Sequence, residues 1–100
     1  MAVTVLSRWS GGSRDDFVRL AGKAKSIMMG HGAEDVRGGQ GYSGAVVGEW
    51  VIAMRFSSWE AYGKAMEAAS TDPAMQALYA DVAAAGSSLV GRGIITSIDI

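Results

Sequence analysis

Four charged side chains fall in segments whose composition predicts buried β-strands: Arg8, Glu49, Arg55 and Arg92. A charge on a buried strand face is costly unless it is paired or binds a ligand. Two interpretations follow. In the first, the charges have structural roles: Glu49 and Arg55 share one predicted strand face and form an ion pair, or the pair forms between subunits, or the arginines lie near strand ends and reach water. Alternatively, Arg8 or Arg55 holds an anionic or enolate oxygen in a cavity. The first interpretation is preferred.

The cavity interpretation assigns roles to neighbouring side chains. Tyr42 or Trp50 would supply an aromatic wall, and Glu49 or His31 would act as a general base. The candidate ligand-binding residues are therefore Arg8, Tyr42, Trp50 and Arg55. The candidate catalytic residues are Arg55, Glu49 and His31, and the sequence favours none of them as the base.

Two further motifs point to cofactors but have simpler explanations. The segment Gly39–Gly44 satisfies G-x-G-x-x-G, yet it precedes a predicted strand and not the helix N-terminus that a dinucleotide site requires. We expect hairpin or bulge glycines there. His31, Glu34 and Asp35 are too few and too exposed for a closed metal site. The sequence therefore predicts no cofactor and no metal.

Composition narrows the function classes. The chain of 100 residues, predicted to be one domain over 1–100, is 49% hydrophobic and has a net charge of −1. Its nine basic residues are scattered, so neither nucleic acid nor an anionic membrane surface is expected as a partner. The absence of cysteine excludes disulfides and thiol nucleophiles. No signal peptide or apolar membrane span is evident, and a cytoplasmic location is expected.

One stretch positions the candidate residues. Val46–Phe56 is rich in β-branched and aromatic residues and predicts a long strand. It leads directly into a helix through a capping box, with Ser57 as the N-cap and Glu60 at the third helical position. Both alternating faces of this strand are largely apolar, which indicates that both faces are covered.

The remaining elements are predicted from periodicity and caps. Strands are expected at Ala2–Trp9, Glu34–Tyr42 and Leu89–Ile100, and helices at Arg14–Met29 and from Trp59 to Ala85. Ser13 is the expected N-cap of the first helix. The second helix is expected to break at Asp72-Pro73, where Asp72 caps a new helix that begins with Pro73.

The order β-α-β-β-α-β predicts an α+β, ferredoxin-like fold, with a four-stranded antiparallel sheet and helices on one face. The helices leave the other face bare, and this face carries either Leu6 and Val51 or the residues that alternate with them. Such an apolar patch exceeds what a soluble monomer normally exposes. We expect two sheets to pack face to face in a homodimer with two-fold symmetry.

The chain resembles the dimeric α+β barrel superfamily, which includes proteins similar to antibiotic-biosynthesis monooxygenases and NIPSNAP-like proteins. The resemblance is carried by Gly48, Trp50, Phe56 and Ser58, followed by Tyr62, Asp72-Pro73, Tyr79 and an apolar final strand. It implies two sheets that enclose a partly hollow barrel. Some relatives oxidise or cyclise aromatic compounds without metal or flavin, and others degrade haem. The single histidine, His31, argues against a haem or histidine-based mechanism.

Two hypotheses follow. The chain is a homodimeric barrel that binds, and oxidises or rearranges, a small apolar or aromatic compound in a cavity between the sheets. A cavity of about 300 Å³ or more with a convergent polar group would distinguish it. The alternative is a non-enzymatic dimeric module whose interior is filled by side chains.

Overall fold

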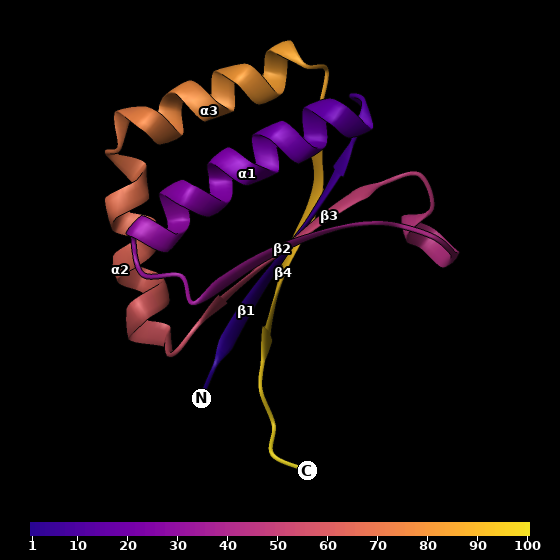
Figure 1. Cartoon of the computed structure of the whole chain (residues 1–100). Helices are drawn as coiled ribbons and strands as arrows, with labels where there is room; N and C mark the ends of the chain where they lie inside the picture. Colours follow the sequence, from indigo (N-terminus) through magenta and orange to yellow (C-terminus); the bar gives the residue numbers. More distant parts are fainter.

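The computed structural model describes residues 1–100 and confirms the predicted element order (Figure 1). The elements are β1 (Val3–Ser10), α1 (Arg14–Gly30), β2 (Asp35–Gln40), the 3-10 turn η1 (Gly44–Val46), β3 (Trp50–Phe56), α2 (Trp59–Ser70), α3 (Pro73–Ala84) and β4 (Ser88–Thr96). The second helical segment breaks where predicted. Asp72 caps α3 by accepting a 2.8 Å hydrogen bond from the Ala74 N–H, and Pro73 begins the helix. None of the three α-helices combines the length and apolarity needed to cross a lipid bilayer.

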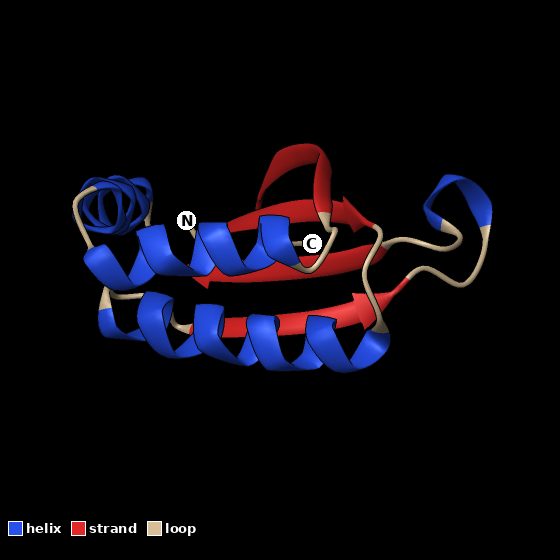
Figure 2. Cartoon of the chain, turned by 90° about the horizontal axis from the view of Figure 1, so that it is seen from above, coloured by secondary structure: helices blue, strands red, loops and turns tan.

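The four strands form one antiparallel sheet in the order β2-β3-β1-β4, so β1 and β3 are central. The helices cover one face of this sheet, with α1 and α3 side by side across it (Figures 1 and 2). This is the ferredoxin-like α+β fold that the sequence predicts.

Strand alternation separates two faces of the sheet. On the helix-covered face Val3 lies opposite Phe56 and Val5 opposite Met54, and both Val3 and Phe56 are fully buried. The opposite face is bare in the single chain. It carries Leu6, Arg8, Val51, Ala53 and Ile95.

The third strand begins later than predicted. The sequence predicts a strand from Val46, but β3 starts at Trp50, and Gly44–Val46 form a 3-10 turn. Gly44 and Gly48 have φ angles of 75° and 81°. These left-handed conformations end the extended chain on both sides of the two valines and override their strand propensity. The segment projects beyond the end of the sheet (Figure 2).

Other boundaries shift by a few residues. The N-cap of α2 is Ser58 and not Ser57, because the Ser58 hydroxyl accepts the 3.1 Å hydrogen bond from the Ala61 N–H. The second and fourth strands are shorter than predicted, since β2 ends at Gln40 and β4 at Thr96.

Candidate functional site

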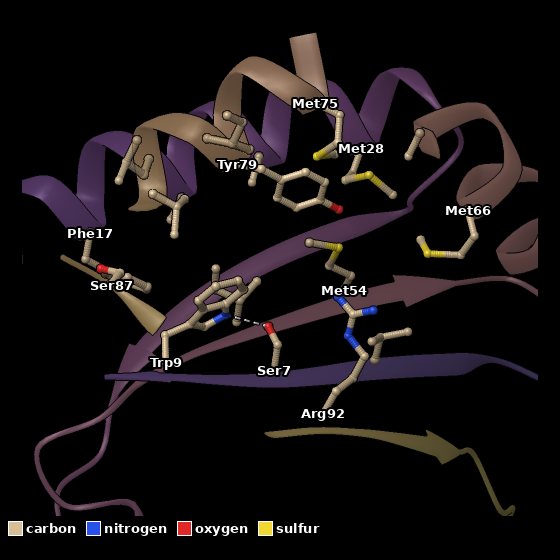
Figure 3. A pocket seen from close by; sticks show the side chains of 18 residues that line it. Ser7, Trp9, Phe17, Met28, Met54, Met66, Met75, Tyr79, Ser87 and Arg92 are labelled. Carbon is tan, nitrogen blue, oxygen red and sulfur yellow. Dashed lines mark hydrogen bonds between the residues drawn. The ribbon is translucent and has the colours of Figure 1, made fainter. Parts of the chain in front are cut away.

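An apolar cavity lies between the helices and the covered face of the sheet (Figure 3). Its volume is about 110 Å³. Its lining residues come from every helix and from β1, β3 and β4: Val5, Ser7, Trp9, Phe17, Leu20, Ala21, Ala24, Met28, Ile52, Met54, Met66, Ala69, Met75, Leu78, Tyr79, Val82, Ser87 and Arg92. Four of the chain's six methionines lie here, and their flexible thioethers adapt readily to the shape of a guest.

Two polar groups face this cavity from neighbouring strands. Ser7 of β1 is the one buried polar residue of the chain, and its hydroxyl oxygen accepts a 2.9 Å hydrogen bond from the Trp9 indole N–H. Arg92 of β4 lies directly opposite Ser7 in the strand register and points toward Met54 (Figure 3). No carboxylate lies within 4 Å of the Arg92 guanidinium, unlike six of the nine basic side chains.

Exposed lining residues mark where the cavity opens. Arg92 is exposed, and about half of the Tyr79 side chain is exposed on α3. β4 is the edge strand on this side, and most of its residues are exposed. The cavity therefore combines a dry, methionine-rich interior with a cation at its mouth, an arrangement suited to an apolar molecule that bears one anionic oxygen.

The sequence explains how these side chains meet. Odd-numbered residues of β1 face the helices, so the side chains of Ser7 and Trp9 lie on the same covered face as those of Val3 and Val5. Ala21 and Ala24 supply only methyl groups from α1, which leaves space above the sheet. In contrast, the position of Arg92 depends on the register between β1 and β4, which shifts between Arg8 and Trp9.

Glu49 and Arg55 each form an ion pair, but not with each other as predicted. Glu49 does not pair with Arg55; its carboxylate lies 2.7 Å from an Arg8 guanidinium nitrogen and also accepts a 2.8 Å bond from Arg8 Nε. Arg55 instead pairs with Glu34 at 3.2 Å. Pairing between strands brings Arg8 and Glu49 together on the bare face, whereas Glu49 and Arg55 are six positions apart along the chain. Both arginines that were predicted to bind an anion, Arg8 and Arg55, are therefore already paired with carboxylates of the same chain.

The structure does not gather the four predicted ligand-binding residues around one cavity. Arg8 and Arg55 lie on the bare face of the sheet. Trp50 lies on the covered face, stacked on Phe17 with ring centroids 5.0 Å apart, and its indole donates a 3.2 Å bond to the Gly11 carbonyl. Tyr42 is 96% exposed in the projecting segment. A shared ligand site for these residues stays a prediction about the assembled protein.

His31 connects the end of α1 to the start of α3. It is the C-cap of α1, and its Nε2 atom lies 2.7 Å from the carboxylate of Asp72, the N-cap of α3. The predicted neighbours of His31 have other partners: Glu34 pairs with Arg55, and Asp35 with Arg37. No group of three possible metal-ligating His, Cys, Asp or Glu side chains occurs.

The His31–Asp72 contact predicts a pH dependence of stability. The hydrogen bond with His31, followed by the one from the Ala74 backbone, lowers the pKa of the Asp72 carboxyl below its ordinary value of 3.8. A depressed folded-state pKa stabilises the fold fully above pH 3.8 and loses this effect as the pH falls through the folded value. Asp72→Asn keeps a capping oxygen but removes the charge. We expect its melting temperature to be lower than that of the wild type at pH 6 and the difference to shrink as the pH falls below 3.8. Equal melting temperatures at both pH values would contradict this.

The glycine motif serves the hairpin between β2 and β3. A Cβ atom at Gly41 would lie 1.7 Å from the carbonyl oxygen of Val46, so only glycine fits this close approach. Gly44–Val46 form a single 3-10 turn and provide no helix N-terminus for a pyrophosphate.

The cavity contains four residues that were not predicted as candidate site residues: Ser7, Trp9, Tyr79 and Arg92. A signal for Ser7 is present, because it is the polar member of the alternating set Val3, Val5, Ser7 and Trp9. Arg92 stood out only as a charge in a strand. Nothing in the sequence reveals that its strand neighbour is Ser7.

Comparisons with known proteins bear on the fold. No family model matches the sequence, and no curated protein matches it either. Three similar solved structures are a variant of SnoaB, a cofactor-independent oxygenase from Streptomyces nogalater; a NIPSNAP domain protein from Burkholderia xenovorans; and a dimeric ferredoxin-like protein from Thermobifida fusca. Their TM-scores are 0.75, 0.68 and 0.61, at 14%, 14% and 10% identity. The matches cover 99%, 100% and 95% of this chain and 95%, 95% and 88% of the others. They confirm the resemblance at the level of the fold.

Proposed function

We propose that this chain, which shares its fold with a cofactor-independent oxygenase, binds the deprotonated form of a compact aromatic phenol or enol between its helices and its sheet. The observation that carries the proposal is the unpaired guanidinium of Arg92 beside a buried, methionine-rich cavity. A guanidinium at the edge of an apolar site stabilises a phenolate or enolate, because it donates charge-assisted hydrogen bonds to the anionic oxygen.

The size of the cavity limits the ligand. The cavity lies between the helices and the sheet and not between two sheets as predicted, and its 110 Å³ is well below the ~300 Å³ that the prediction required for a drug-sized ligand. Benzene occupies an engineered apolar cavity of ~150 Å³ in another protein, so even a single aromatic ring requires this cavity to expand. Rearrangement of the flexible side chains of Met28, Met54, Met66 and Met75 would provide that space.

The lining residues also define what the protein contributes chemically. They include no carboxylate and no histidine, so the acidic proton of the ligand passes to solvent through the open mouth. Arg92 makes that ionisation more favourable, and Ser7 is positioned to donate its hydroxyl proton to a bound oxygen. A bound carbanion or enolate is the form that reacts with dioxygen without a cofactor. For an enol or phenol whose keto tautomer carries a methylene group, written R₂CH₂, the balanced reaction is R₂CH₂ + O₂ → R₂C=O + H₂O, in which that carbon supplies the four electrons.

The protein is proposed to act as a homodimer. Leu6, Val51 and Ala53 form an apolar strip along the central strands of the bare face, and one similar structure is described as dimeric. Two copies of this face packed together would remove the strip from water. The charged Arg8–Glu49 pair lies on the same face and would be neutralised within each chain.

The test uses 4-nitrophenol, whose phenolate form absorbs visible light. We expect the wild-type protein to bind it and to lower its apparent pKa. Arg92→Ala should weaken binding ~10- to 100-fold, the range for losing a charge-assisted hydrogen bond, and should abolish the pKa change. Arg14→Ala is the matched control, because Arg14 is also unpaired but lies outside the cavity lining.

Two results would overturn the proposal. One is equal binding by Arg92→Ala and the wild type. The other is equal binding of 4-nitroanisole, which cannot ionise. If neither compound raises the melting temperature, the alternative of a non-enzymatic dimeric module is supported.

A further inference from the structure

A groove of about 650 Å³ runs between α1 and β2, outside the cavity described above. Its lining includes two unpaired cations, Arg14 and Lys25, and no carboxylate. The nearby Asp35 carboxylate is already paired with Arg37, which lowers its pKa. Lys25 also acts on Asp35 at longer range, as the smallest of the contributions that lower its pKa, so the groove as a whole presents a net positive charge.

The two cations lie on one stripe of α1. Lys25 lies eleven positions after Arg14, which is about three helical turns and ~16 Å along the axis. Between them the stripe carries Val18, which is 60% exposed, and Gly22, which adds no side chain. An apolar segment about 16 Å long thus has a positive charge at each end.

The floor of the groove is an open strand edge. β2 is the outermost strand, and its residues from Arg37 to Gln40 are exposed. The Gly41 N–H donates a 2.8 Å bond to the Glu49 carbonyl. Because hydrogen-bonded pairs alternate in an antiparallel ladder, the backbone groups of Val36, Gly38 and Gln40 point away from β3 to the free edge. The other edge strand, β4, has a register shift, whereas the pairing of β2 with β3 is regular over six residues.

We propose that this groove binds an extended acidic peptide, which adds as a strand to the free edge of β2 and places carboxylates on Arg14 and Lys25. Inward side chains of such a strand recur every second residue, at ~6.6 Å. Two acidic residues four positions apart, with a small apolar residue midway, therefore span about 13 Å. The long side chains of Arg14 and Lys25 make up the difference of about 3 Å from their ~16 Å separation. Adding a strand to an exposed edge is an established mode of peptide recognition.

The groove favours this occupant over two others. If a second copy of the chain paired with β2 edge to edge, Arg37, Arg14 and Lys25 of one copy would lie close to the same cations of the other copy. The like charges would repel each other. A small dianion would remain largely exposed in so open a groove, whereas small-molecule sites normally enclose most of the ligand. A peptide backbone also satisfies the free N–H and carbonyl groups of β2.

The test measures binding of a fluorescein-labelled peptide with the repeat Glu-Thr-Val-Thr-Glu by fluorescence anisotropy. We expect the double variant Arg14→Glu/Lys25→Glu to weaken binding at least ~10-fold, because two favourable charge pairs become repulsive. Lys25→Ala should weaken it severalfold. Lys64→Ala, which removes another exposed helical lysine, should leave it unchanged.

A second variant tests the strand geometry. Gln40→Pro removes an N–H that faces the free edge without removing a bond to β3. We expect it to weaken peptide binding at least ~10-fold, with a small change in melting temperature. NMR titration of the wild type should shift the amide signals of Val36, Gly38 and Gln40.

Three outcomes would overturn the proposal. One is unchanged binding in Gln40→Pro. Another is binding of adipate as tight as that of the peptide, which would indicate a small-anion site. The third is slow hydrogen exchange of the Gly38 and Gln40 amides in the free protein, which would show that a second copy already occupies this edge. None of these readouts depends on the Arg92 site.

Discussion

Leu6→Glu is expected to convert the proposed homodimer into a monomer. Leu6 lies on β1 at the middle of the bare face, between Ala53 of β3 and Gly93 of β4. A two-fold interface would contain the substitution twice, and each unpaired buried carboxylate costs several kcal/mol. The dimer dissociation constant should therefore rise at least ~1,000-fold, which corresponds to about 4 kcal/mol.

Sedimentation velocity over a range of concentrations provides the measurement. The circular dichroism spectrum should stay native, since Leu6 is only half-buried in the single chain. Val18→Glu makes the same chemical change on the exposed surface of α1 and serves as the control. A wild-type chain that sediments as a monomer at every concentration would contradict the dimer, as would a Leu6→Glu dimer of unchanged affinity.

Ala24→Leu is expected to abolish ligand binding by filling the cavity. Ala24 is buried on α1 and lines the cavity. Leucine adds three carbon atoms there, so the affinity for 4-nitrophenol should fall at least ~100-fold. Burial of each added carbon contributes ~0.8 kcal/mol, and overpacking opposes this by about 1–3 kcal/mol. The net change in stability should therefore be small.

The matched control is Ala65→Leu. Ala65 is fully buried but does not line the cavity, so leucine has no empty space to occupy. We expect this variant to lose about 1–3 kcal/mol of unfolding free energy and to bind 4-nitrophenol as the wild type does. Calorimetric unfolding and a binding titration separate the two effects. Unchanged binding in Ala24→Leu would show that the ligand does not occupy this cavity.

Local patterns in the sequence determined the elements and the fold. Alternation assigned Val3 and Val5 to one face of β1, and the caps at Ser13 and Asp72 marked helix starts that the structure confirms. Each of these signals acts over a few residues, so it survives without knowledge of the rest of the chain. The prediction from local composition was wrong at Val46 and Val47, where Gly44 and Gly48 produce a turn in place of the expected strand.

Only the tertiary structure decided the partners of each side chain. The sequence placed Glu49 and Arg55 on one strand face but did not reveal that Glu49 would pair with Arg8, 41 residues away. Likewise, Arg92 faces Ser7 only because β4 pairs with β1 in a particular register. Registers between distant strands are set by the summed packing of both faces and by loop closure, which no short segment encodes. Alternation could therefore divide each strand into two faces, whereas the tertiary structure decided which face is bare and formed the cavity.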